Sequence, residues 1–288
     1  MFTERASLRM GWRARRARPT CCLLPAVRCL LSGMKCNSNL PSSTPPSSPT
    51  FLRMEPGLFI VGTPIGNLAD LSARAIETLQ QVDLICAEDT RHTQRLTQRH
   101  DIQTPLTSYH KFNEAQRTQS IIQRIQEGQA IALVSDSGMP TISDPGVRLI
   151  QACQQAQLSI TPIPGPTALT TALACSGLPH PGFTFIGFLP PKSGGRQREL
   201  TRWADHPLPI ILYESPHRLL KLMTEIEQHL GPDRQLFVAR ELTKKHEELL
   251  NGNPAAITNA FQNRTVKGEL VVILHPLPPT PTNTKQSR

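Results

Sequence analysis

Short apolar runs of strand character alternate with segments of helical character from Leu58 onward, and this alternation constrains the fold most. The runs contain few polar side chains, which predicts strands that are buried on both faces. Such strands are typical of largely parallel sheets with helices on both sides. We therefore predict an α/β fold with strands at residues 58–61, 84–87, 130–134, 159–163, 183–186, 209–213, 236–239 and 269–274.

Helices are predicted in the segments between these strands. Ser72 is a plausible N-cap for the first helix, and Ser215 followed by Pro216 is typical of a helix start. Gly128 is well placed to end a helix. The predicted helices cover residues 72–82, 114–127, 147–156, 167–176 and 254–262, with a further one beginning at 215.

A stretch rich in Gly and Pro, residues 177–195, predicts a boundary between two α/β domains. We expect the N-terminal domain at residues 54–177, the C-terminal domain at 178–276 and a loose tail at 277–288. Ligands of such sheets bind beyond the carboxyl ends of the strands. The polar motifs of this chain fall at those ends.

The basic charge of the chain is concentrated in residues 1–53. This segment carries nine Arg and Lys but one acid, so it accounts for +8 of the net charge of +9. Its Ser/Pro stretch, residues 42–50, predicts disorder. Three interpretations are open: a transit peptide, an arm that contacts RNA phosphates, or an overlong reading frame whose translation starts at Met34 or Met54. The last is favoured. The high isoelectric point is a property of this segment and says little about what the folded part of the chain binds.

The loop after the first predicted strand reads Gly-Thr-Pro-Ile-Gly-Asn-Leu, residues 62–68. It matches neither the Walker loop nor the dinucleotide-binding pattern. Pro64 restricts the backbone and removes an N–H donor, so the loop suits a neutral or cationic ligand better than a polyphosphate. An ordinary strand-to-helix turn is the alternative.

Charged or Gly/Pro-rich motifs follow the other strands. Each is compatible with a polar ligand wall, but a solvated loop, a helix cap or a turn would use the same residue types. Arg240 and Lys244 could contact phosphates, or Arg240 could form a structural ion pair with Glu241. The motifs cover residues 87–93, 135–146, 164–168, 213–218 and 239–245.

Several classes of protein are disfavoured. No apolar run approaches the ~18 residues of a membrane span. The histidines and cysteines lack metal-ligand spacing, so we predict no metal site, and no nucleophile-elbow motif occurs. Cys86, Cys153 and Cys175 are predicted to be small buried hydrophobes in a reducing compartment.

As an ordered set, these motifs resemble one family, ribosomal RNA small subunit methyltransferase I, the 2′-O-ribose branch of the tetrapyrrole-methylase superfamily. The resemblance extends over about residues 57–275. It rests on Leu58–Thr93, Ala132–Gly146, Pro164–Ala168, Gly187–Lys192, Tyr213–Leu220, Ala239–Lys244 and Lys267–Leu274.

The resemblance implies two α/β domains of the tetrapyrrole-methylase type with S-adenosylmethionine in a cleft between them. It implies a cytoplasmic homodimer that acts on small-subunit ribosomal RNA or the 30S particle, at a decoding-centre cytidine, cytidine 1402 in the usual 16S numbering. Carried over, the cofactor-binding residues would be Pro64, Ser135, Asp136, Ser137, Gly138, Pro164, Thr167, Tyr213, Ala239, Arg240, Glu241, Leu242 and Gly268.

Methyl transfer to a ribose hydroxyl would be helped by a base or a cation near the hydroxyl. The candidates are Glu88, Asp89, Arg91 and His110, which sequence does not rank, and Arg91 could instead clamp a phosphate. Basic clusters at residues 192–202 and 240–245 are expected to contact RNA.

The chain differs from the family's usual sequence in two respects, and two other functions are open. The chain ends soon after Leu274, where related proteins often continue with a basic helical extension, so RNA binding could be weaker or supplied elsewhere. Ser137 and Met139 stand where a smaller residue and a Thr are expected. The alternatives are a methyltransferase acting on a tetrapyrrole-like small molecule, and a non-catalytic RNA-binding or assembly module.

Overall fold

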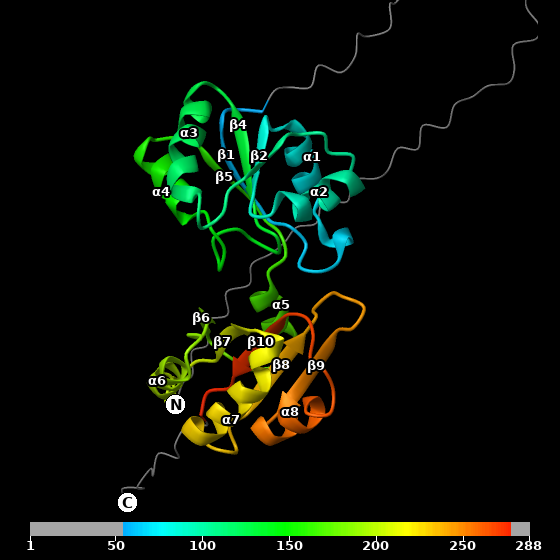
Figure 1. The fold of residues 1–288 in the computed structure, drawn as a ribbon, viewed down its shortest axis with the longest axis vertical. Coiled ribbons are helices and arrows are strands. Elements are labelled where there is room, and N and C mark those ends of the chain that lie inside the picture. Colours follow the sequence, from blue (N-terminus) through cyan, green and yellow to red (C-terminus); the bar gives the residue numbers. More distant parts are fainter. Residues whose placement is uncertain (1–53, 278–288) are drawn as a thin grey trace, which may run out of the picture. The chain divides into compact units, whose positions relative to one another are not determined.

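The computed structural model describes residues 54–277, so the predictions for residues 1–53 and for 278–288 lie outside the described residues. Ten strands in this part of the chain form two five-stranded sheets (Figure 1). No helix of the described part is long and apolar enough to cross a membrane.

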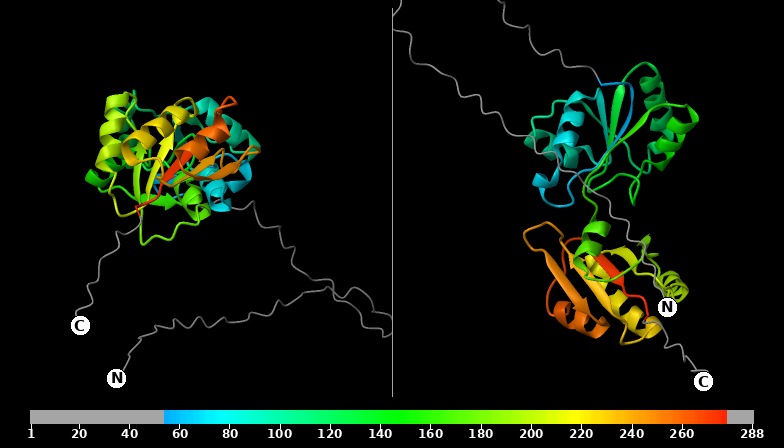
Figure 2. Two further views of the ribbon diagram at one scale, coloured as in Figure 1. Left: turned by 90° about the horizontal axis from the view of Figure 1, so that it is seen from below. Right: turned by 180° about the vertical axis from the view of Figure 1, so that it is seen from behind.

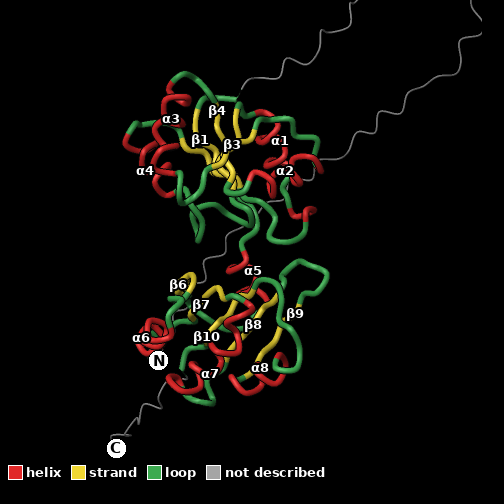
Figure 3. Tube along the Cα trace, viewed as in Figure 1, coloured by secondary structure: helices red, strands yellow, loops and turns green. Residues whose placement is uncertain are grey.

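The first sheet is entirely parallel, with strand order β3-β2-β4-β1-β5. Loops that follow its strands gather at one edge, where the carboxyl ends of the strands meet (Figure 3). Its strands are β1 (Gly57–Val61), β2 (Leu84–Ala87), β3 (Leu106–Ser108), β4 (Ala130–Val134) and β5 (Ile160–Ile163).

Helices cover both faces of this sheet, as predicted (Figure 1). On one face lie the short 3-10 turn η1 (Leu68–Asp70), α1 (Ala73–Gln81) and α2 (Thr90–Arg99). On the other face lie α3 (Glu114–Gln126) and α4 (Val147–Gln155). The Ser72 hydroxyl caps α1 by accepting a hydrogen bond of 3.1 Å from the Ala75 N–H.

The second sheet has strand order β6-β7-β10-β8-β9. Only the β6–β7 pair is parallel, whereas β10 runs antiparallel to β7 and β8, and β8 antiparallel to β9. The prediction of largely parallel sheets is therefore wrong for this half. Its strands are β6 (Thr184–Phe188), β7 (Ile210–Glu214), β8 (Leu236–Arg240), β9 (Glu248–Gly252) and β10 (Leu270–Leu274).

Three helices cover one face of the second sheet: α6 (Ser193–Arg202), α7 (Leu219–Leu230), which follows the 3-10 turn η2 (Pro216–Arg218), and α8 (Pro254–Phe261). Helices α7 and α8 pack against each other (Figure 2). The other face buries apolar side chains of α5 (Ala168–Cys175) together with Ile65 and Leu242. The division at residue 177 into two domains stays a prediction.

Candidate active site

Two glycines bring the loops after β1 and β5 into backbone contact. A Cβ on Gly62 would lie 2.6 Å from the Gly165 Cα and 2.6 Å from the Met139 sulfur. The side chain of the next residue, Thr63, donates hydrogen bonds to the Ser135 and Gly138 carbonyl oxygens at 3.1 and 3.2 Å. These contacts hold the loops after β1, β4 and β5 in one rigid unit.

A cavity of about 360 Å³ lies at these loops and takes its walls from both halves of the described chain. Its volume falls within the range of small-molecule binding sites. The lining residues are Ile65, Glu88, Asp136, Ser137, Gly138, Met139, Ile142, Ser143, Asp144, Thr167, Ala168, Phe188, Tyr213, Glu214, Ser215, Pro216, Ala239, Leu242, Gly268, Glu269, Leu270 and Val271.

Eight of the thirteen predicted cofactor-binding residues line this cavity. They are Asp136, Ser137, Gly138, Thr167, Tyr213, Ala239, Leu242 and Gly268. Pro64, Ser135, Pro164, Arg240 and Glu241 do not line it. The buried Ser135 hydroxyl instead bonds to the Gly138 carbonyl at 3.2 Å, which helps to shape the loop beneath the cavity.

Aromatic side chains form part of the apolar wall. Tyr213 packs edge-on against Phe185 and Phe188, with ring centroids 5.0 and 5.6 Å apart. Burial raises the pKa of the Tyr213 hydroxyl, so this group remains protonated at neutral pH. These rings offer a ligand aromatic surface within the cavity.

Carboxyl groups also line the cavity, on Glu88, Asp136, Asp144, Glu214 and Glu269. Burial, which is the larger cause, and the negative charges of the neighbouring Asp144 and Asp136 together raise the pKa of Glu88 to about 7. The pKa of Asp144 is also raised by burial, although a hydrogen bond with Ser135 opposes this effect. Asp136 is oriented by the Asp89 backbone N–H, which donates to its carboxylate at 3.0 Å. This acidic wall favours a positively charged ligand and disfavours phosphates.

Of the four predicted catalytic residues, only Glu88 lines the cavity. Asp89 is the N-cap of α2, and its pKa is lowered to about 2 by its hydrogen bonds with Arg91. The Arg91 side chain is 89% exposed and pairs with Asp89 at 3.0 Å. His110 bonds within its own turn, where its ring contacts the Asn113 amide at 3.2 Å.

Asp144 and Ile65 are cavity residues that the sequence-based site did not include. Asp144 belongs to the Ser-Asp-Pro-Gly motif that follows β4, and Ile65 belongs to the loop after β1. Both motifs were recognised from their Gly and Pro content, so the signal was present. Sequence does not reveal which side chain within a loop turns inward.

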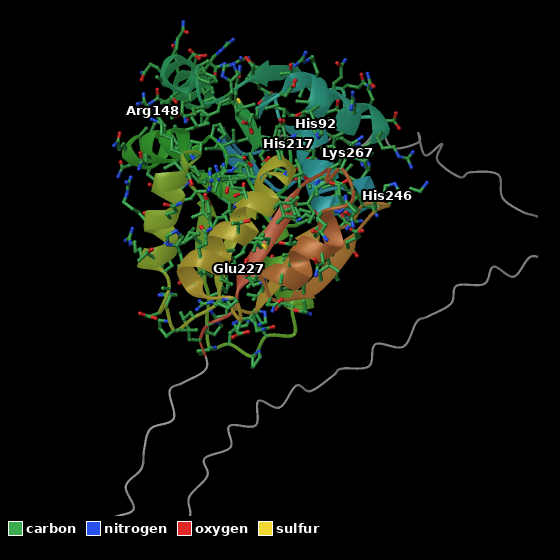
Figure 4. The ribbon with its side chains drawn as sticks, turned by 60° about the horizontal axis from the view of Figure 1, so that its bottom comes forward. His92, Arg148, His217, Glu227, His246 and Lys267 are labelled. Carbon is green, nitrogen blue, oxygen red and sulfur yellow. The ribbon has the colours of Figure 1, made fainter. Side chains whose placement is uncertain are left out.

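The ionic residues after β8 form structural contacts. Arg240 pairs with Glu248 at 2.6 Å and donates to the Lys267 and His246 carbonyl oxygens, which lie on neighbouring loops (Figure 4). Lys244 pairs with Glu241 at 2.8 Å. The predicted partnership of Arg240 with Glu241 is therefore wrong, because each residue has another ionic partner.

Some side chains of the predicted basic cluster at residues 192–202 also form ion pairs within the protein. Arg196 is buried and pairs with Glu225 of α7 at 2.6 Å, so it faces the core instead of solvent. Arg202 lies 3.7 Å from Glu199.

Within residues 54–277 no group of His, Cys, Asp and Glu side chains has the arrangement of a metal site.

Solved structures with this arrangement of sheets include the methyltransferase CobJ and a uroporphyrin-III C-methyltransferase of Thermus thermophilus complexed with S-adenyl homocysteine. The first has a TM-score of 0.59 and 18% identity, and the match covers 77% of this chain and 94% of that one. The second has a TM-score of 0.53 and 15% identity, with 75% and 96% covered. These similarities define the fold as that of the two-sheet α/β methylases.

Comparison with known sequences identifies the family to which the chain belongs within this fold class. The profile described as Tetrapyrrole (Corrin/Porphyrin) Methylases matches residues 57–257. Ribosomal RNA small subunit methyltransferase I of Synechocystis sp. is 51% identical over 217 residues, 75% of this chain and 78% of the relative. Its counterpart in Escherichia coli O157:H7 is 48% identical over 221 residues, with 75% and 77% covered. The chain belongs to the tetrapyrrole methylase family, within its ribosomal RNA small subunit methyltransferase I branch.

Proposed function

We propose that this protein methylates the 2′-hydroxyl of a decoding-centre cytidine in small-subunit ribosomal RNA, cytidine 1402 in the usual 16S numbering. It acts in the cytoplasm as a homodimer. The substrate class follows from relatives that are 48–51% identical and are called ribosomal RNA small subunit methyltransferase I. The observation that supports the chemistry is the cavity that Glu88 lines together with apolar side chains.

The protein is a methyltransferase that uses S-adenosylmethionine, in agreement with the family and with the S-adenyl homocysteine complex of a solved structure of this fold. The residues present fit this cofactor. A cavity of about 360 Å³ lined by both apolar and acidic side chains suits a molecule that joins an adenosine to a cationic centre. Asp136, Thr167, Tyr213 and Leu242 would hold it.

When bound, S-adenosylmethionine supplies a methyl group on a positively charged sulfur. The chain must then orient the ribose hydroxyl, exclude water and accept the hydroxyl proton. Glu88 is the proton acceptor, because its pKa of about 7 makes it a stronger base than an ordinary carboxylate while leaving it partly ionised at neutral pH. The apolar side chains of Ile65, Leu242 and Val271 exclude water.

The test is methyl transfer from labelled S-adenosylmethionine to small ribosomal subunits that lack this modification, with the product nucleotide mapped. We expect label in a decoding-centre ribose and its loss with Glu88→Gln. Label in a small molecule but not in RNA would instead identify a tetrapyrrole-type activity. The absence of cofactor binding in calorimetry would identify a non-catalytic module, and either result would refute the proposal.

A further inference from the structure

Helix α2 presents an exposed row of basic side chains that has no place in the chemistry above. Arg91, Arg95 and Arg99 are exposed and follow one another at intervals of four residues, which puts them along one side of the helix. His92 also lies on the exposed part of α2 (Figure 4). Thr93, Leu96 and Thr97 form its buried side.

Most of the positive charge of this row is not neutralised by ion pairs with carboxylates. Helix α2 contains no acidic residue, and its only acidic neighbour in an ion pair is the N-cap Asp89, which engages Arg91. Within residues 54–277 neither Arg95 nor Arg99 makes a salt bridge. This contrasts with Arg240 and Lys244, whose charges are neutralised by carboxylates.

Phe112, between β3 and α3, is 92% exposed although its backbone is well held. The His110 backbone N–H donates to the Asn113 side chain at 2.8 Å, and the Asn113 amide donates to the Ser108 carbonyl at 3.3 Å. The turn therefore holds the phenyl ring in water instead of burying it. An exposed aromatic ring is the feature that proteins use to stack on an unpaired base.

Both features belong to segments that start at the strand end next to the cavity. Glu88, which lines it, precedes the α2 N-cap directly in sequence. The turn that carries Phe112 begins beside the same strand end, because the Tyr109 N–H donates to the Ala87 carbonyl at 2.7 Å. From Arg91 to Arg99 the row extends ~12 Å along the helix axis, long enough to follow a nucleic-acid backbone.

We propose that the exposed side of α2 and Phe112 form a docking surface for the single-stranded RNA next to the target nucleotide. The arginines of the row contact phosphates, and Phe112 stacks on an unpaired base. This inference rests on the proposed function, since it names the surface that delivers the ribose to Glu88. An acidic protein would match the charge but would not require the exposed aromatic ring.

The test compares the full-length wild type with Arg95→Ala/Arg99→Ala, Phe112→Ala and Phe112→Trp. The control, Arg124→Ala/Lys221→Ala, removes two exposed cations from α3 and α7. Binding to unmethylated small ribosomal subunits is measured by filter retention without cofactor at several salt concentrations. Methyl transfer to the same subunits and cofactor binding by calorimetry are measured alongside.

We expect Phe112→Ala to weaken subunit binding about ten-fold and Phe112→Trp to restore it. The double arginine variant should weaken binding and reduce the slope of log K against log salt by ~1.4, the value for two phosphate contacts on a single strand. The control should bind like the wild type, and all variants should bind cofactor normally.

The two hypotheses fail in different ways. Wild-type methyl transfer with variants that bind subunits like the control would overturn the docking surface and leave the function intact. Weakened binding in the variants, but no methyl transfer by the wild type, would support the surface and refute the function. Wild type that binds no subunits would overturn the surface. A loss in the arginine variant alone would overturn the stacking role of Phe112.

Discussion

Glu88 gives the sharpest prediction, because its protonation connects the geometry of the cavity to a measurable rate. Its carboxyl has an ordinary pKa of 4.5 that is raised to about 7, first by burial and then by Asp144 and Asp136. A base with a pKa of 7 is about one-tenth ionised at pH 6 and about nine-tenths ionised at pH 8. The single-turnover rate should therefore rise with pH, by up to about ten-fold across this range.

Two variants separate the causes. Glu88→Gln should lower the rate by ~10²–10⁴-fold and remove the pH dependence, because the proton acceptor is lost. Asp144→Asn removes a neighbouring negative charge, so the midpoint should move toward lower pH. It should not return to 4.5, since burial is the larger cause.

The assay is rapid-quench methyl transfer to unmethylated small subunits at saturating cofactor between pH 5.5 and 8.5. A bound cationic cofactor lowers the pKa of a nearby carboxyl, so the midpoint should lie at or below 7. A rate that is flat across the range, or a Glu88→Gln variant within three-fold of the wild type, would refute the role of Glu88 as base.

Thermal unfolding tests the raised pKa of Glu88 independently of the methyl-transfer rate. Because the pKa of Glu88 is higher in the folded than in the unfolded chain, its contribution to stability is fully present below pH 4.5 and is lost as the pH rises through about 7. Glu88→Gln should therefore have a higher Tm than the wild type at pH 8. A lower Tm at pH 8 would mean that the carboxylate is stabilised in the fold, contrary to its surroundings.

Three further predictions concern the scaffold. Gly62→Ala places a Cβ 2.6 Å from the backbone of the adjoining loop, so calorimetry should show a cofactor Kd raised at least ~ten-fold, whereas Gly194→Ala, which meets no atom, should bind normally. Arg196→Ala leaves the Glu225 carboxylate buried and unpaired, so urea unfolding should show a loss of ~3–5 kcal/mol, most of it recovered in the double variant Arg196→Met/Glu225→Leu. Arg240→Ala should lower the Tm but leave the KM for small subunits within two-fold, and a larger rise in KM would contradict its structural role.

The first sheet could be predicted closely from the sequence because its strands are uniformly apolar and its helices have recognisable ends. Ser72 caps α1 as expected, and β4 covers the predicted residues 130–134. Helix α2 was not predicted as a helix, because Thr93 and Thr97 occupy its buried side and weaken the apolar periodicity. Strand β3 has three half-buried residues, too few to give a pattern.

Strand direction in the second sheet could not be predicted for a different reason. Strands β7, β8 and β10 are buried along most of their length. A strand that is buried on both faces has the same apolar pattern whether its neighbours run parallel or antiparallel, so periodicity carries no information about direction. Direction here depends on the β8–β9 hairpin, whose second strand alternates between half-buried and exposed residues.

The residues of the cavity could also be predicted only in part from the sequence. Sequence located most of the loops that form it, since they follow β1, β2, β4 and β5 at the carboxyl edge of the first sheet, or β7 and β8 of the second. It could not rank Glu88 above Asp89, because the two are adjacent carboxylates that differ only in where their side chains point. One faces the cavity and has a pKa of about 7, whereas the other caps a helix and has a pKa of about 2.

This contrast also explains how an acidic cavity can serve an RNA substrate. The carboxyl groups of Glu88, Asp136 and Asp144 disfavour phosphates, so the RNA backbone should remain outside the cavity. The arginines of α2 do not line it, and in the proposed docking they would attract phosphates without neutralising Glu88. A ribose hydroxyl is neutral, and it can approach Glu88 while its own phosphates stay with the arginines. Separating the two charges in this way keeps the base strong and still holds a polyanion within reach of it.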